Sequence, residues 1–418
     1  MTTEWAPTDY TAEATYAGTR RPVATATTLV PDAYTSEAFF AVERERVFAG
    51  GWVAVGCTGE VTEPGDAVVV DVAGRSVIVA RGRDGVLRGF YNVCRHRGTR
   101  LLDEGPCRIA RAIRCPYHSW AYDLEGRCLG APLFDRSGIP DDQRAIFDTS
   151  AAPSFDKADH ALLPVAVDTF GPLVLACLDP AAGPLAEPLG DLPERLAGYR
   201  LDEWRLARTG AYEIEANWKL VGENFMEYYH LPWVHPGLVQ VSPMEAHHRW
   251  QGTGLYTGMC TSPIAADAGA GGWESGLAPI PGLGEDDAVS ARFVWLFPNV
   301  ALNVLPNHVF LILAIPRGPG RTSERTYLLT HPESGSGDAA EAATGKLAAF
   351  WDAVNREDIA IVERVQLGLA TTPFPGGPMC YRFEEPVHRF QNMVADRMVG
   401  VRRIPPGDAA PRTPMFVD

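Results

Sequence analysis

The sequence predicts an α+β protein of two domains, an all-β domain followed by a larger domain of mixed strands and helices. With 418 residues, the chain exceeds a typical single domain and can bury two cores. Short β-branched runs separated by turn signals occupy residues 46–165, which indicates the all-β domain. Strand-like segments and helical segments are interspersed over residues 166–418, which indicates the mixed domain.

The first two regions are assigned from the N-terminus onward. Residues 1–45 form an N-terminal helical extension, since the segment that starts at Ser36 has helical periodicity. The runs Val68–Val72 and Ser76–Ala80 are strands of the 46–165 domain. Asp84-Gly85 follows between apolar segments and predicts a hairpin turn.

The 166–418 domain contains three clear strands and two helices, in the order Leu173–Leu178, Asn217–His230 (helix), Phe293–Phe297, Val309–Leu313 and Thr344–Leu369 (helix). A stretch rich in Gly, Pro, Ala and Asp over residues 265–289 has weak periodicity. It predicts a mobile loop, which is either a lid over a pocket or a plain surface insertion.

Composition and charge exclude several classes of protein. Apolar residues make up 46% of the chain, which is typical of a globular protein. The formal net charge of −15 argues against nucleic acid or an anionic membrane as a partner. No basic start leads into an apolar run, and no apolar run approaches the roughly 18 residues of a membrane helix. We therefore expect a cytoplasmic protein.

Two short Cys/His pairs give the strongest functional signal. Cys94-Arg-His96 and Cys115-Pro-Tyr-His118 supply two thiolates and two imidazoles on two short loops. Such a set fits structural zinc, and it also fits a [2Fe–2S] cluster with two Cys on one iron and two His on the other. Zinc fingers usually pair Cys with Cys and His with His, whereas each pair here is mixed. The spacing therefore favours the iron–sulfur cluster.

A second signal lies about 110 residues further on, at His230 and His235. Glu227 and His230 are three residues apart and would share a face of the predicted helix. Pro232 would break that helix, so that the chain turns and brings the two imidazoles together. Two His and one carboxylate are the ligands that non-haem Fe(II) oxygenases use.

The carboxylate has to come from elsewhere, and Asp358 is the best candidate. Valines and isoleucines surround Asp358 at helical spacing, and a carboxylate in an apolar stripe needs a partner such as a metal. Glu357 is its main competitor. Asp352 has Arg356 at i+4 and is interpreted as part of a surface ion pair.

These segments resemble the catalytic (alpha) subunits of Rieske non-haem iron oxygenases. The similar stretches begin at Asn92, Cys115 and Asn217, and the Glu-Asp … Gln-x-Gly pattern around Asp358 resembles the family's third-ligand segment. The resemblance implies a Rieske β-sandwich domain with a [2Fe–2S] cluster, and a helix-grip catalytic domain with mononuclear Fe(II). Cys94, His96, Cys115 and His118 would hold the cluster. His230, His235 and Asp358 would hold the iron.

The resemblance also implies a role for Glu227. In the family, an acidic residue at this position links the first iron-binding His to the second His of the cluster across a subunit boundary. The bridge would join His118 of one subunit to Glu227 and His230 of the next, which implies a homotrimer. Glu at this position is typical of a branch that acts on quaternary ammonium compounds such as carnitine and glycine betaine.

The implied reaction is the O2-dependent hydroxylation of a small organic substrate, with oxidative N-demethylation if the substrate is a quaternary ammonium compound. The chain shows no G-x-G-x-x-G fingerprint, so electrons from NAD(P)H would arrive through a separate reductase, with or without a ferredoxin. A methylammonium substrate would need an aromatic cage. Its candidates are Trp250, Tyr256, Trp295 and Phe297, although an aromatic residue of this kind is more often simply part of the core.

Two other functions remain open at this point. The first is an aromatic-ring hydroxylating oxygenase of the same family. The second is a non-enzymatic protein, either a Rieske electron carrier or a zinc-stapled binding protein. An electron carrier would leave His230, His235, Asp358 and the large second domain unexplained.

Overall fold

The structure is a computed structural model that describes residues 8–134, 141–143, 154–262, 264, 276–371, 374–403 and 412–414. The chain forms two compact units. The small unit comprises residues 55–169 and 173–181. The large unit comprises residues 1–54, 170–172 and 182–418. Part of the predicted 265–289 loop, namely residues 265–275, lies outside the described residues.

The small unit is built from β-strands. A seven-stranded sheet has the order β1-β10-β9-β4-β3-β2-β5, and a three-stranded sheet has the order β6-β7-β8. The bounds are β1 Trp52–Cys57, β2 Asp66–Val72, β3 Arg75–Arg81, β4 Leu87–Tyr91, β5 Gly105–Arg108, β6 Ile113–Arg114, β7 Ala121–Tyr122, β8 Cys128–Gly130, β9 Pro164–Phe170 and β10 Leu173–Cys177. β2 and β3 pair antiparallel. The predicted turn at Gly85, whose φ is 81°, connects β3 to β4.

One hydrophobic cluster fills the core of the small unit. Val69, Ile78 and Phe90 contribute from the seven-stranded sheet, and they are 4% exposed or less. Cys94 and Cys115 belong to the same cluster. The two predicted Cys/His loops are therefore anchored in the core of this unit at their cysteines.

The large unit contains an eight-stranded sheet of order β11-β17-β16-β15-β14-β13-β12-β18. Neighbouring strands pair antiparallel throughout. The bounds are β11 Arg205–Ile214, β12 His247–Trp250, β13 Tyr256–Thr261, β14 Ala291–Leu296, β15 Val300–Val304, β16 Val309–Gly318, β17 Arg321–Thr330 and β18 Arg412–Pro414. Together with the helices below, this sheet confirms the predicted α+β class.

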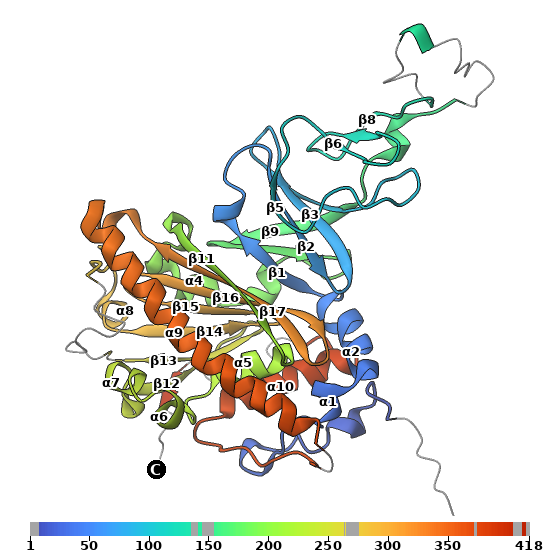
Figure 1. Ribbon diagram of the computed structural model, residues 1–418. Helices are drawn as coiled ribbons and strands as arrows, with labels where there is room; N and C mark the ends of the chain where they lie inside the picture. Colours follow the sequence, from blue (N-terminus) through green and yellow to red (C-terminus); the bar gives the residue numbers. More distant parts are fainter. Residues whose placement is uncertain are drawn as a thin grey trace, which may run out of the picture. The chain divides into compact units, whose positions relative to one another are not determined.

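A long helix, α9, crosses the eight-stranded sheet (Figure 1). Its Leu347 and Trp351 share a core cluster with Phe310 of β16 and Leu328 of β17. α9 spans Gly337–Leu369, and the other helices are α1 Asp32–Thr35, α2 Glu37–Glu43, α3 Ala186–Leu189, α4 Leu192–Arg195, α5 Trp218–Met226, α6 Leu231–Val234, α7 Leu238–Val241, α8 Glu285–Ala288 and α10 Glu385–Met398. In the described part of the chain, no helix combines the length and apolar character that crossing a membrane requires.

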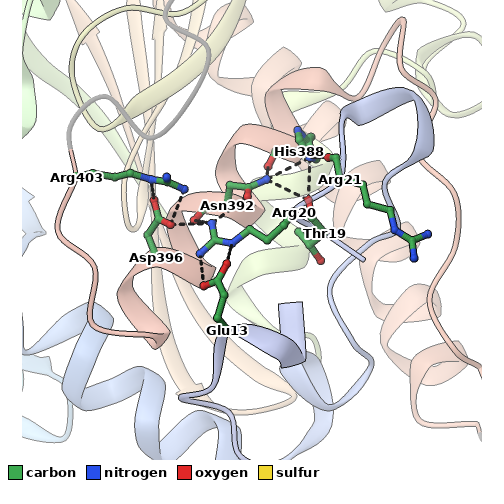
Figure 2. Close-up of polar contacts among 8 residues, drawn as sticks. All are labelled: Glu13, Thr19, Arg20, Arg21, His388, Asn392, Asp396 and Arg403. Carbon is green, nitrogen blue, oxygen red and sulfur yellow. Dashed lines mark hydrogen bonds and ion pairs between the residues drawn. The ribbon is translucent and has the colours of Figure 1, made fainter. Parts of the chain in front are cut away.

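The N-terminal segment packs on α10 through a polar cluster (Figure 2). Arg20 binds Asp396 of α10 at 2.7 Å and Glu13 at 2.7 Å. Arg403, beyond the end of α10, binds the other carboxylate oxygen of Asp396 at 2.7 Å. The Asp396 side chain is 4% exposed, so two cations compensate one buried anion.

A buried ion pair connects α2 to α5. Lys219 Nζ lies 2.6 Å from Glu43 Oε1, and both side chains are fully buried. Trp218 donates its indole N–H to the second oxygen of Glu43 at 2.8 Å. Burial raises the pKa of Glu43 and lowers the pKa of Lys219, while the attraction between the two opposes both shifts. The pair fixes the start of the helix that leads to the candidate iron site.

Candidate metal centres

Two loops of the same construction carry the Cys/His pairs of the small unit. Each cysteine N–H donates to the carbonyl five residues later, Cys94 to Thr99 at 2.8 Å and Cys115 to Trp120 at 2.7 Å. Each cysteine carbonyl accepts from the N–H four residues later, that of Gly98 or Ser119. Gly98 and Ser119 both have positive φ, 72° and 58°. The two loops are thus structural equivalents, each with one thiol and one imidazole.

The four side chains of these loops lie together. The Cys94 and Cys115 thiols interact directly, and the ring centroids of His96 and His118 are 4.7 Å apart. His96 stacks on Trp120 at 5.2 Å, which is consistent with Trp120 as a shield of this site. His96 Nδ1 is buried and has no hydrogen-bond partner among the described residues. Burial lowers the pKa of His96, which favours the neutral imidazole that binds metals.

This donor set fits a [2Fe–2S] cluster. An orphaned buried imidazole nitrogen is costly unless a metal binds it. Two thiolates on one side and two imidazoles on the other are the ligands that a Rieske cluster uses. All eight cysteines of the chain are free thiols, so neither cysteine of the site is held in a disulfide.

The second candidate site forms where α5 ends, and the structure corrects the predicted helix. α5 stops at Met226, and Glu227 is extended with φ −117° and ψ 155°. Glu227 and His230 therefore do not share a helical face. Pro232 also differs from the prediction, because it occupies the first turn of a new short helix, α6, where its missing N–H costs nothing. His230 and His235 flank α6 at its two ends.

His230, His235 and Asp358 of α9 converge on one point. His235 Nε2 lies 2.7 Å from Asp358 Oδ1, and His230 Nε2 lies 3.5 Å from the same oxygen. The ligand atoms of all three residues lie within 4.8 Å of one another. Two imidazole nitrogens and one carboxylate on one side of a common point form the donor set of a mononuclear non-haem iron site.

A second carboxylate holds the outer nitrogen of each imidazole. His230 Nδ1 lies 2.5 Å from Glu227 Oε1, and the His230 N–H donates to Glu227 Oε2 at 3.1 Å. His235 Nδ1 lies 2.6 Å from Glu357 Oε2. With a metal bound, these contacts would hold the ring proton on Nδ1 and leave Nε2 as the ligand atom. Glu357 was the alternative candidate for the carboxylate ligand. It lies on the side of His235 that faces away from the point where His230, His235 and Asp358 converge.

A cavity with a free volume of about 590 Å³, including its open part, adjoins this triad. The four predicted cage residues are not among its lining residues. Arg195 covers the ring of Trp250 at 3.6 Å, so the protein supplies the cation on that ring. Five other aromatic residues line the cavity, namely Phe225, Tyr228, Phe293, Phe310 and Trp351. Phe225 and Tyr228 belong to the His230 segment, which is the signal by which the sequence could have indicated them.

Comparison with known proteins agrees with this geometry. Residues 51–148 match the Rieske [2Fe-2S] domain family. Residues 201–400 match the family of the ring hydroxylating alpha subunit (catalytic domain). Together these matches span more than half of the chain.

Similar proteins of known name cover most of the chain. The glycine betaine monooxygenase oxygenase subunit of Chromohalobacter salexigens is 27% identical over 396 residues, covering 88% of this chain and 84% of that protein. The carnitine monooxygenase oxygenase subunit of Acinetobacter pittii is 29% identical over 353 residues, covering 82% and 85%.

Solved structures show the same architecture. The quaternary ammonium Rieske monooxygenase CntA in complex with L-carnitine superposes with a TM-score of 0.72 at 27% identity, covering 93% of this chain and 99% of that one. Naphthalene 1,2-dioxygenase with indole bound has a TM-score of 0.71 at 18% identity, covering 94% and 95%, and shares the fold. The chain belongs to the Rieske non-haem iron oxygenases, as an oxygenase subunit with a Rieske domain and a ring-hydroxylating catalytic domain.

Proposed function

We propose that this chain hydroxylates a methyl carbon bound to nitrogen in a small methylammonium compound. The observation that carries the proposal is the convergence of His230, His235 and Asp358 beside an aromatic cavity in a chain that also contains a Rieske domain. The named relatives that act on carnitine and glycine betaine support this substrate class. A Rieske electron carrier would need neither the triad nor the cavity.

The reaction balances as a monooxygenation. One atom of O2 enters a C–H bond, the other leaves as water, and two electrons and two protons are consumed. The resulting N–CH2OH group releases formaldehyde and leaves the demethylated amine. When bound, the mononuclear iron supplies O2 activation and the cluster supplies electrons one at a time.

The residues of this chain would hold the two metal centres, orient the metal-binding imidazoles and enclose the substrate. Cys94, His96, Cys115 and His118 would hold the cluster, and His230, His235 and Asp358 would hold the iron. Glu227 and Glu357 orient the two imidazoles through Nδ1. The apolar lining keeps water away from the reacting carbon and positions the substrate beside the triad.

The need for electrons implies protein partners that deliver them. Members of this family receive electrons from a separate reductase, and we propose NAD(P)H as their source, with or without a ferredoxin. We also propose a cytoplasmic homotrimer, in which His118 of one subunit is bridged to His230 of the next by Glu227. The bond between Glu227 and His230 supplies one half of that bridge within a single chain.

Reconstitution tests the proposal. The iron-loaded oxygenase, supplied with a reductase and NADH, is expected to consume O2 and release formaldehyde with methylammonium compounds. Hydroxylated aromatic products without formaldehyde would instead support the aromatic-ring hydroxylating alternative.

A further inference from the structure

We infer that the substrate of this chain is a small organic cation that carries no carboxylate. This inference rests on the proposed function and narrows it, because carnitine and glycine betaine are both zwitterions with a carboxylate. The charge and hydrogen bonding of the residues that line the cavity support it.

The described cavity lining supplies no cation. Its eighteen residues include neither Lys nor Arg. Apart from the imidazoles of His230 and His235, which would bind the iron, its ionisable acidic groups are the carboxylates of Glu227 and Asp358. The remaining residues are apolar, aromatic or neutral amides, apart from Ser242. A carboxylate that enters such a cavity loses its hydration and finds no cationic side chain in the lining, so the iron that the triad would hold is the positive charge left to compensate it.

Three of the polar lining residues are already hydrogen-bonded within the protein. Asn303 Nδ2 donates to the carbonyl of Phe310 at 2.9 Å. Asn355 Nδ2 donates to the buried Glu324 at 2.6 Å. The Ser242 hydroxyl pairs with His247 at 3.1 Å and with Thr261 at 2.8 Å. Asn224 is the remaining lining amide, and the buried hydroxyl of Tyr228 has no hydrogen-bond partner among the described residues. Both groups are neutral and do not compensate the charge of a carboxylate.

The strand arginine next to the lining residue Phe293 is directed elsewhere. Arg292 precedes the lining residue Phe293 on β14, so its side chain leaves the sheet on the other face. It forms an ion pair with Asp287 at 2.5 Å. Arg292 is therefore engaged away from the cavity and supplies no counter-ion for a bound carboxylate.

The same lining suits a cation. The rings of Phe225 and Tyr228 lie 6.5 Å and 6.4 Å from the ring of Phe293, and the latter pair is edge-to-face at 87°. Three aromatic rings around one part of a cavity, with carboxylates beside them, form the surroundings in which quaternary ammonium groups bind. The lining therefore favours positive charge.

Calorimetric titration of the iron-loaded oxygenase tests the inference with three matched compounds. Choline is a cation without a carboxylate, glycine betaine adds the carboxylate, and 3,3-dimethylbutan-1-ol replaces the ammonium nitrogen of choline by carbon. We expect choline to bind at least about tenfold more tightly than either of the others. Equal or tighter binding of glycine betaine would overturn the inference while leaving the proposed function intact. Equal binding of the neutral alcohol would also overturn it.

Failure of the proposed function gives a different result. In that case no ammonium compound binds, and O2 uptake with reductase responds to aromatic compounds instead.

A charge placed in the cavity provides a second test. Leu238→Arg puts a guanidinium at a half-buried lining position, and Leu238→Gln is the neutral control. The arginine variant is expected to gain about tenfold in affinity for glycine betaine and to lose affinity for choline. Val354→Arg, on α9, repeats the test if Leu238→Arg loses iron. An unchanged preference in variants that keep both metals would contradict the inference.

Discussion

Glu357 hydrogen-bonds Nδ1 of His235 at 2.6 Å, on the side of the imidazole that faces away from the convergence point. The adjacent residue on α9, Asp358, contacts the other nitrogen of the same imidazole at 2.7 Å. Two neighbouring carboxylates thus have different roles, one as a candidate iron ligand and one as a residue that orients a ligand.

The first prediction separates these two roles. Asp358→Ala removes a ligand atom and should abolish mononuclear iron while preserving the absorption of the cluster. Glu357→Gln keeps a hydrogen-bonding group and should weaken iron binding by about 10- to 100-fold. Metal analysis after dialysis against a graded chelator measures both. Loss of iron in Glu357→Gln with retention in Asp358→Ala would reverse the assignment.

The second prediction concerns Glu227. Glu227→Gln keeps a side chain of the same shape beside His230 and should retain the cluster and the iron. Turnover with reductase is expected to fall by at least about tenfold, because the charged link between the two centres is lost. Single-turnover measurements with a chemically reduced cluster distinguish slow electron transfer from poor substrate binding. Undiminished turnover would exclude Glu227 as the bridge.

The third prediction concerns the buried pair of Glu43 and Lys219. Lys219→Met leaves the carboxylate of Glu43 buried without its counter-ion and should cost about 3–5 kcal/mol in the free energy of unfolding. The double variant Glu43→Leu/Lys219→Met removes both charges and should recover most of this loss. Denaturant unfolding followed by tryptophan fluorescence measures both. A double variant as unstable as Lys219→Met would show that the charge imbalance is not the cause.

The fourth prediction concerns acid stability. His308 is fully buried and accepts the indole N–H of Trp351 at 2.9 Å, and burial lowers its pKa to about 3. The unfolded chain binds a proton at this residue below its ordinary pKa of 6.5, whereas the folded chain does not. His308 should therefore reduce stability progressively as pH falls from 6.5 towards 3.

The measurement compares the unfolding midpoint of the wild type and His308→Gln across this pH range. The variant is expected to be less stable at neutral pH and to lose less stability on acidification. Parallel curves for the two proteins would contradict the role of His308.

The bounds of some strands and helices were predicted from the sequence more accurately than others, for physical reasons. The strands Val68–Val72 and Ser76–Ala80 were predictable from local sequence, because β-branched residues favour strands and Gly favours turns. The long helix starts at Gly337 and not at Thr344, since its first turns are rich in Ala, which favours a helix without marking a buried face. The end at Leu369 matches the prediction.

The geometry of the site was less accessible. The spacing of His230 and His235 predicted that their imidazoles come together. The backbone that brings them together differs from the prediction, since Pro232 lies in the first turn of α6 and does not break a helix. None of the four predicted cage residues lines the cavity beside the triad, although Trp295 lines a neighbouring pocket that includes Asp358. Composition does not show which face of a strand an aromatic side chain occupies. Trp250 carries Arg195 on its ring, and sequence alone does not reveal such a distant partner.

The central claim is that one chain carries both a Rieske cluster and a mononuclear iron. The most direct measurement is the iron and acid-labile sulfide content of the purified chain. A brown protein with about three irons and about two sulfides per chain is predicted, since a [2Fe–2S] cluster contains two of each and the triad binds one more iron. A colourless protein with one zinc and no sulfide would contradict the account.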